Sequence, residues 1–256
     1  MLYEVLKPLT FLALRGLFHL RAIGVENVPR EGPVLLAANH VSLLDPPVVG
    51  AGAPRPLQFM AKAELFRVPL FGRLIRALNA HPVERDGADA GALRHALLLL
   101  REGKALLVFP EGTRGIPGSL QRGRPGAGML AALSEAPVVP VYVEGTGHVL
   151  PRGARGLRRA PITVRYGPPL RFGRERGKRR YQEVSDQIMA AIGRLKAEAE
   201  QASSSAARPP ATLGSVGDRD PRAEAERGAG PRHGKNAERT ARGPLPAGQF
   251  DNTGGP

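Results

Sequence analysis

The chain contains an apolar run, Pro33-Val34-Leu35-Leu36-Ala37-Ala38, that ends directly in the polar string Asn39-His40-Val41-Ser42-Leu43-Leu44-Asp45. A short, continuous apolar run of this kind predicts a strand buried on both faces, as in a parallel sheet. Such a strand delivers the residues that follow it to its C-terminal end, where ligands bind in open α/β sheets. The stretch therefore predicts a parallel α/β fold and a functional site after residue 38.

Short apolar runs alternate with helical patterns along the rest of the chain. This alternation predicts an α/β domain with a mainly parallel sheet flanked by helices. Further strands are expected at residues 57–61, 81–84, 105–109, 138–143 and 162–166, and helices at 70–78, 89–103, 127–133 and 181–197.

A second polar string, Phe109-Pro110-Glu111-Gly112-Thr113-Arg114, begins where the expected strand at 105–109 ends. Gly112 allows a tight turn that brings backbone N–H groups close to a ligand. Arg114 offers a planar fork of donors suited to phosphate, and Glu111 can accept a hydrogen bond from a hydroxyl of the same molecule. The alternative interpretation is a strand-end turn with a Glu–Arg surface pair. Because both strings follow strands of one sheet, we expect them to share its ligand-binding edge.

His40 is the candidate general base, because a neutral imidazole can take the proton of an alcohol as it attacks an acyl carbonyl. Asp45 is placed to orient that imidazole and to stabilise its protonated form. On a continuous helix, five residues separate two side chains by about 140°, so this pairing requires a turn after His40. Pro46 and Pro47 suit Asp45 as the N-cap of a following helix, and a cap without a catalytic role is the alternative. Ser42 lacks a glycine-flanked elbow, so we do not expect an acyl-serine route.

The two ends of the chain differ in composition from its middle. Residues 1–24 are rich in Leu, Phe and Val but too interrupted by charge to span a bilayer. We expect an amphipathic interfacial helix there with Arg15 and Arg21 at headgroup level, the alternative being a helix packed on the core. Residues 25–200 form the expected main domain. Residues 203–256, rich in Ala, Arg, Gly and Pro, are expected to form a disordered tail.

The net charge of +14 is concentrated in residues 152–180, which hold eleven Lys and Arg against one acidic residue. So basic a stretch either attracts an anionic surface or is simply a solvated face. Its only aromatic residues are Tyr166 and Phe172, too few for a base-stacking platform, so we expect no nucleic-acid partner. The absence of cysteine excludes disulfides and thiolate nucleophiles, and no histidine–carboxylate spacing predicts a metal site.

The ordered set of strings resembles the glycerolipid acyltransferases of the PlsC type, the 1-acyl-glycerol-3-phosphate acyltransferases. Asn39-His40 with Asp45 is similar to the first block of that family, a histidine and an aspartate separated by four residues. Pro82-Val83-Glu84-Arg85 resembles the second block, Phe109 to Arg114 the third, and Val139-Pro140-Val141 the fourth. The similarity extends over residues 10–195, with the blocks in the family's order.

The resemblance implies an enzyme that moves a fatty acyl group from acyl-CoA or acyl-carrier protein to the free hydroxyl of lysophosphatidic acid. The product would be phosphatidic acid, a step in phospholipid biosynthesis. Glycerol 3-phosphate, another lysophospholipid or a lyso-aminolipid stay open as acceptors. Apart from the acyl donor, which acts as co-substrate, no cofactor and no metal are expected.

The resemblance also implies roles and a location. His40 would be the general base and Asp45 its orienting partner. The enzyme would act at the cytoplasmic face of the membrane, as a peripheral or monotopic protein on an anionic membrane surface. The residues implied in substrate binding are Arg85, Glu111, Gly112, Thr113 and Arg114.

Overall fold

The computed structural model describes residues 2–83, 90–154, 156–174 and 176–206, and these residues form strands, helices and two short 3-10 helices. The strands are β1 (Arg21–Ile23), β2 (Val34–Ala38), β3 (Leu57–Lys62), β4 (Ala80–Val83), β5 (Ala105–Val108), β6 (Val138–Glu144) and β7 (Thr163–Tyr166). The helices are α1 (Leu2–Phe18), α2 (Asp45–Gly52), α3 (Pro69–Ala77), α4 (Ala90–Arg101), α5 (Pro125–Ser134), α6 (Thr146–Val149) and α7 (Lys178–Ala206), and the 3-10 helices are η1 (Val25–Asn27) and η2 (Ala63–Arg67).

The strands form one sheet in the order β1-β7-β6-β2-β5-β3-β4. Every neighbouring pair is parallel except β6 with β7, which is antiparallel. The predicted α/β fold with a mainly parallel sheet is therefore confirmed. Strand β2 lies at the centre of the sheet, between β6 and β5, so the residues that follow it emerge near the middle of the ligand-binding edge.

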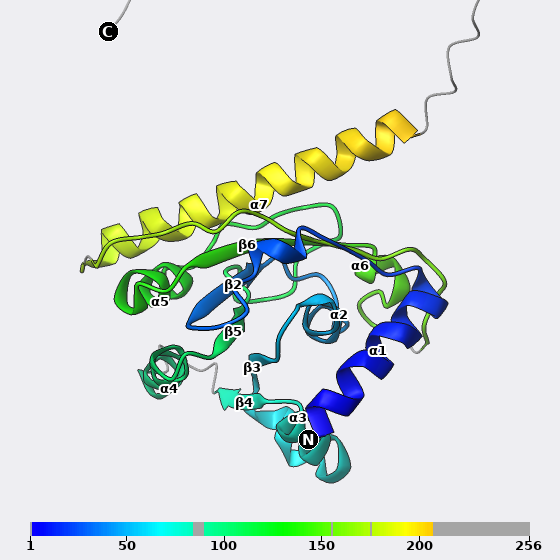
Figure 1. Cartoon of the computed structure of the whole chain (residues 1–256), viewed down its shortest axis with the longest axis horizontal. Helices are drawn as coiled ribbons and strands as arrows, with labels where there is room; N and C mark the ends of the chain where they lie inside the picture. The colour runs from blue at the N-terminus through cyan, green and yellow to red at the C-terminus, as the bar shows by residue number, and fades with distance from the viewer. Residues whose placement is uncertain (1, 84–89, 155, 175, 207–256) are drawn as a thin grey trace, which may run out of the picture. The chain divides into compact units, whose positions relative to one another are not determined.

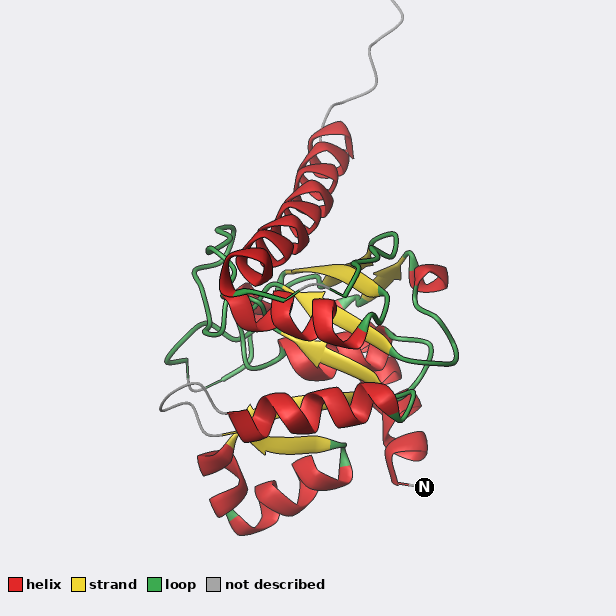
Figure 2. Cartoon of the chain, turned by 90° about the vertical axis from the view of Figure 1, so that its left-hand side faces the viewer, coloured by secondary structure: helices red, strands yellow, loops and turns green. Residues whose placement is uncertain are grey.

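Strand β2 is buried over its whole length because helices cover both faces of the sheet (Figure 1). Val34, Leu36 and Ala38 belong to the core layer shared with α1 and α2. Leu35 and Ala37 belong to the opposite layer, shared with α4, α5 and α7. Alternate residues of a strand point to opposite faces, so a strand in a sheet with helices on both sides (Figure 2) requires a continuous apolar run.

The elements differ from the sequence prediction at three places. Strand β1 and helix α6 were not predicted, because elements of three and four residues are too short to show a period. Helix α7 is longer than the predicted helix at 181–197, and its last turn takes in residues 203–206 of the predicted tail. Alanine, glutamate and glutamine, which favour helix, fill much of this extension, and Ala199 is fully buried. The remaining tail, residues 207–256, lies outside the described residues.

Helix α1 has two apolar faces. Tyr3, Leu14 and Phe18 are buried, and the last two belong to the core layer beside α2. Val5 and Leu12, by contrast, lie on a largely exposed apolar stripe together with Leu9. The helix is thus packed on the domain core while keeping an apolar face at the surface. In the described part of the chain, no helix is both long and apolar enough to cross a bilayer.

Helices α5 and α7 meet through a glycine. A Cβ atom at Gly128 would collide with the backbone carbonyl oxygen of Tyr181, which belongs to α7. Gly126, two positions earlier in α5, faces open space. The close approach of the two helices therefore depends on the missing side chain at Gly128.

We expect Gly128→Ala to destabilise the protein by about 1–3 kcal/mol, because α5 and α7 must separate to admit the methyl group. The melting temperature measured by circular dichroism should fall by several degrees. Gly126→Ala is the matched control, and it should be neutral or stabilising by about 0.4–1 kcal/mol. Equal melting temperatures for the two variants would contradict the role of Gly128.

Candidate functional site

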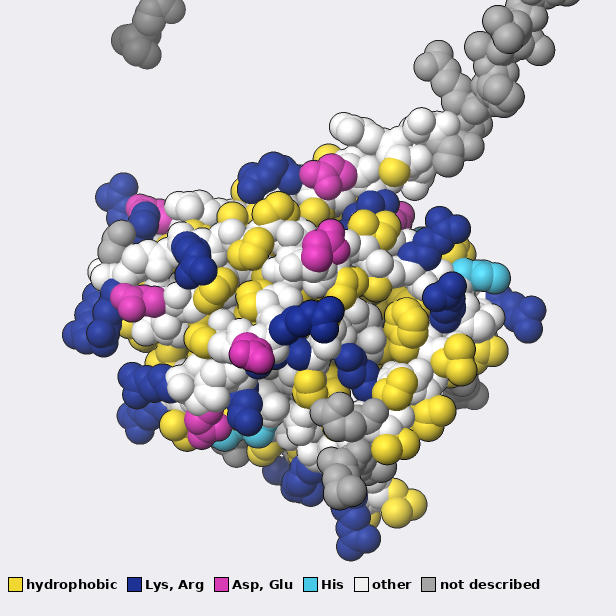
Figure 3. Space-filling view, viewed as in Figure 1, with side chains coloured by type: hydrophobic (Ala, Val, Ile, Leu, Met, Phe, Trp, Pro, Cys, Tyr) yellow, Lys and Arg dark blue, Asp and Glu magenta, His cyan; other side chains and the backbone are white. Residues whose placement is uncertain are grey.

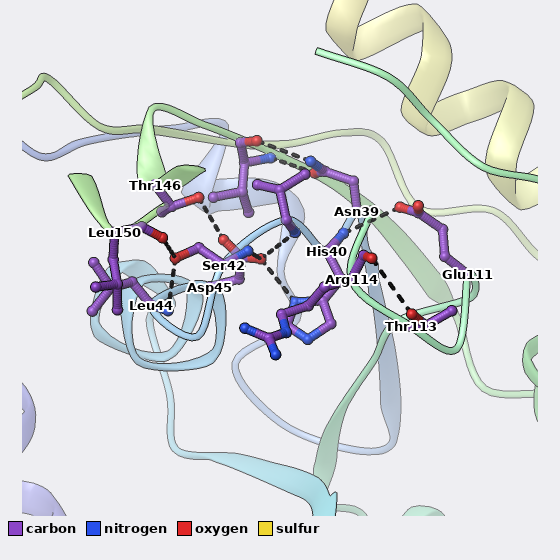
Figure 4. A network of polar contacts seen from close by, with 12 residues as sticks. Asn39, His40, Ser42, Leu44, Asp45, Glu111, Thr113, Arg114, Thr146 and Leu150 are labelled. Carbon is purple, nitrogen blue, oxygen red and sulfur yellow. Dashed lines mark hydrogen bonds and ion pairs between the residues drawn. The ribbon is translucent and has the colours of Figure 1, made fainter. Parts of the chain in front are cut away.

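The His40–Asp45 pair forms across the turn between β2 and α2 (Figure 4). The imidazole Nδ1 atom lies 2.8 Å from Asp45 Oδ2, and both residues are buried. The predicted pairing across a turn is therefore present in the structure. Asp45 is the first residue of α2 and Leu44 occupies the N-cap position, so the prediction of Asp45 as the cap itself is off by one residue.

The Asp45 carboxylate accepts three hydrogen bonds besides that of His40. The backbone N–H groups of Val41 and Ser42 donate to Oδ2 at 2.7 and 2.8 Å. The hydroxyl of Thr146 donates to Oδ1 at 2.6 Å. So many donors hold the carboxylate in one orientation. A carboxylate accepts only, so Nδ1 of His40 carries a proton and its Nε2 atom is the acceptor of the neutral ring.

Thr146 was not found by sequence analysis. It opens helix α6 just after β6, about a hundred residues from Asp45 along the chain. No local pattern marks it, because only the pairing of β6 with β2 brings the two side chains together. Its position at the end of a strand neighbouring β2 is the one signal that could have pointed to it.

Glu111 is a second buried carboxylate, with 1% of its surface exposed. Its Oε1 atom accepts the backbone N–H of His40 at 3.1 Å, and Oε2 accepts that of Gln121 at 3.2 Å. Burial raises the pKa of this carboxyl above its usual value, and the two N–H donors act in the opposite direction. The sequence predicts that Glu111 binds a substrate hydroxyl. That role stays a prediction, and in the structure both oxygens of Glu111 hold the backbone next to the site.

The turn at residues 111–115 lies directly beside His40. The backbone N–H of Gly115 donates to the carbonyl of His40 at 2.7 Å. Gly112 has a left-handed φ of 70°, and a Cβ atom there would meet Arg124 Cδ at 2.8 Å, so the turn requires glycine. The hydroxyl of Thr113 donates to the carbonyl of Arg114 at 3.4 Å, and the Arg114 side chain is half-buried.

The structure brings together six of the seven residues predicted for the site. His40 and Asp45 form the centre, and the turn of Glu111, Gly112, Thr113 and Arg114 lies next to them (Figure 4). The seventh, Arg85, lies outside the described residues. Across the described chain, no group of three or more His, Asp or Glu side chains is placed to hold a metal ion.

Further side chains fix the position of His40. The ring of Phe109 stacks on the imidazole, with centroids 4.0 Å apart and an angle of 18° between the planes. The amide of Asn39 exchanges two hydrogen bonds with the backbone of Val143, donating at 3.0 Å and accepting at 2.7 Å. The hydroxyl of Ser42 donates to the carbonyl of Leu150 at 3.0 Å and is thus engaged in the fold.

Comparisons with known proteins point to the acyltransferase family that the sequence motifs resemble. An acyltransferase family model matches residues 19–144. A chloroplastic 1-acyl-sn-glycerol-3-phosphate acyltransferase of Brassica napus is 31% identical over 52% of this chain and 40% of its own length. The 1-acyl-sn-glycerol-3-phosphate acyltransferase of Bacillus subtilis is 27% identical over 74% of this chain and 94% of its own. The crystal structure of the 1-acyl-sn-glycerophosphate acyltransferase PlsC from Thermotoga maritima superimposes with a TM-score of 0.63 at 28% identity, covering 76% of this chain and 80% of that one.

The acyltransferase family model covers the buried histidine–aspartate pair and the arginine-bearing turn, both at strand ends of the mainly parallel sheet. The family model, the relatives and the solved structure together support the PlsC-type acyltransferase family for this chain. The chain spans about two fifths of the length of the Brassica napus relative.

We expect Thr146→Val to lower kcat for acyl transfer by on the order of tenfold and to leave KM unchanged. The valine keeps the shape of the side chain but leaves Oδ1 of Asp45 buried without its donor, at a cost of about 1–3 kcal/mol. Steady-state kinetics would measure both constants. Ser134→Ala, which removes a hydroxyl bonded at the end of α5, is the control and should change neither. An unchanged kcat would remove Thr146 from the support of Asp45.

Proposed function

We propose that this protein transfers a fatty acyl group from acyl-CoA or acyl-carrier protein to the free hydroxyl of 1-acyl-glycerol-3-phosphate, forming phosphatidic acid. The single observation that carries the proposal is the buried His40–Asp45 pair, whose backbone is joined to the Arg114-bearing turn through Glu111 and Gly115. This arrangement supports a reaction in which a general base acts beside a phosphate-binding arginine. The similarity to relatives named 1-acyl-sn-glycerol-3-phosphate acyltransferases supports the same acceptor.

In the proposed reaction, the acceptor hydroxyl gives its proton to His40 Nε2 while its oxygen attacks the carbonyl carbon of the thioester. Asp45 holds Nδ1 and stabilises the imidazolium that forms. The C–S bond then breaks, and the departing thiolate takes the proton from His40, so the base is restored. The thioester is already activated, so no covalent acyl-enzyme is needed, in keeping with the engaged hydroxyl of Ser42.

The acceptor phosphate is assigned to Arg114, with Arg85 as the second cation of the sequence prediction. The Arg114 guanidinium presents a planar fork of donors that matches phosphate oxygens. Its backbone position is fixed, because the next residue, Gly115, donates to the carbonyl of His40. A substrate whose phosphate rests on Arg114 would keep its free hydroxyl near the base. Glycerol 3-phosphate satisfies the same chemistry and remains the alternative acceptor.

The substrates are amphiphiles, so the proposed enzyme works at a membrane surface. The exposed stripe of α1, Val5, Leu9 and Leu12, is suited to the interface of a lipid leaflet. Arg15 is exposed on the same helix and Arg21 just beyond it, where they would meet anionic headgroups. We therefore assign α1 a double role, in the core and on an anionic membrane surface. The basic stretch at 152–180 would add to that attraction or meet an acidic donor.

We expect His40→Ala to lower the rate of acyl transfer by at least two orders of magnitude, because general-base catalysis of this kind contributes about 10²–10⁴-fold. Purified protein would be assayed on liposomes with several lyso-acceptors, each paired with acyl-CoA and with acyl-carrier protein. His148→Ala removes an exposed histidine on α6 and is the control. No transfer by the wild type to any phosphorylated acceptor would refute the proposed function.

We expect Arg114→Ala to raise the KM for the phosphorylated acceptor by roughly 10- to 100-fold, because it removes hydrogen bonds to a charged group worth about 1.5–3 kcal/mol. The KM for the acyl donor should stay unchanged. Arg94→Ala removes an exposed arginine of α4 and serves as the control. An unchanged acceptor KM in Arg114→Ala would assign the phosphate to another cation.

A further inference from the structure

The segment between β3 and β4 exposes an unusual amount of apolar surface. It consists of η2 and α3 and is called here the η2–α3 hairpin, residues 63–77. Leu70 is 81% exposed, the highest value among the exposed large apolar residues of the described chain. Val68, Phe71 and Leu74 are each about half exposed beside it. Four adjoining apolar side chains at the surface mark an interaction site rather than scattered exposure.

The fold of the hairpin forces these side chains outward. Leu70, Phe71 and Leu74 fall within about 100° of one another around α3, and Gly72 lies roughly opposite them. A Cβ atom at Gly72 would collide with the carbonyl of Phe66, so this side of α3 is pressed against η2. Phe66 itself is buried. The apolar stripe therefore cannot turn inward without breaking the contact between η2 and α3.

Positive charge accompanies the apolar stripe. Arg67, Arg73 and Arg76 are all exposed on the hairpin. The Arg76 guanidinium carbon lies 5.1 Å from the centre of the Phe66 ring, which keeps this cation against the hairpin. The one acidic residue of the hairpin, Glu64, is paired with Lys62 at 2.5 Å. Apolar side chains surrounded by arginines are complementary to an anionic lipid leaflet, with its acyl chains below and its phosphates above.

The hairpin begins at the edge of the sheet that carries the site. Helix η2 follows the C-terminal end of β3, which is parallel to β5 and lies two strands from β2. His40 and the turn at 111–115 follow the C-terminal ends of β2 and β5. Figures 1 and 2 place α3 at the same end of the molecule as the start of α1. Figure 3 shows apolar side chains gathered over α1 on this side.

We propose that the η2–α3 hairpin is a second membrane-binding element, which inserts Leu70, Phe71 and Leu74 into an anionic leaflet while Arg67 and Arg73 contact lipid phosphates. This inference goes beyond the proposed reaction and adds a second point of attachment to α1. The axis of α1 and the separate hairpin together define a plane of contact, which α1 alone does not. They would hold the edge of the sheet that carries His40 and the turn at 111–115 in a fixed orientation toward the lipid.

The chain has no tryptophan, so a single introduced one reports on its own surroundings. Phe71→Trp in the full-length protein would be mixed with phosphatidylcholine–phosphatidylglycerol vesicles. We expect a blue-shifted emission that brominated acyl chains quench. Leu98→Trp, at an exposed apolar position on α4, is the matched control and should show neither effect. If the vesicle-bound Phe71→Trp variant shows neither a shift nor quenching, the proposal is overturned. The readout needs no acyl transfer, so it stands apart from the test of the proposed function.

A second measurement uses vesicle co-sedimentation. Leu70→Ser with Leu74→Ser should weaken partitioning into anionic vesicles by on the order of tenfold or more, whereas Leu98→Ser should not. Arg67→Gln with Arg73→Gln should weaken binding to phosphatidylglycerol vesicles but not to pure phosphatidylcholine. The apolar surface of the hairpin could instead bind a second copy of the chain, and sedimentation velocity without lipid tests this alternative. A dimer that the serine variants dissociate, with vesicle binding unchanged, would overturn the proposal.

Discussion

The structure of the site depends on one buried carboxylate. Asp45 accepts hydrogen bonds from His40, from the backbone of the turn at 41–42 and from Thr146. These donors come from three places: the end of β2, the turn before α2 and the start of α6. A buried charge is tolerated only when it is so surrounded. The carboxylate therefore ties together the elements that meet at the site, and a change in any of them alters the position of the imidazole.

Glu111 repeats this arrangement on the other side of His40. Its two oxygens hold the backbone of His40 and of Gln121, so it joins the strand end of β2 to the chain that follows β5. One carboxylate thus fixes the imidazole ring, and the other fixes the backbone that carries it. Phe109 adds a stacked ring against the imidazole. The histidine is thus held from three directions, and the fold fixes the position of its imidazole before any ligand binds.

The sequence predicted the parallel sheet and the His40–Asp45 pair, because the first follows from continuous apolar runs and the second from a spacing across one turn. It did not predict the partners that only topology supplies. Thr146 reaches Asp45 through the pairing of β6 with β2, and no local pattern records that pairing. The sequence shows that Glu111 is close to Arg114, but not that it is buried and holds the backbone of His40. Residue type and order thus predict a candidate site, and three-dimensional contacts supply the groups that hold it in place.

Helix α1 cannot be removed without affecting the core of the domain. Its inner face supplies Leu14 and Phe18 to the core, and the Tyr3 hydroxyl accepts the backbone N–H of Leu57 at 3.2 Å. A truncation meant to remove the apolar outer face would also open a cavity under α2. Removal of this helix would therefore also remove part of the domain core. Surface substitutions at Val5, Leu9 and Leu12 change the exposed face of α1 and leave its core contacts in place.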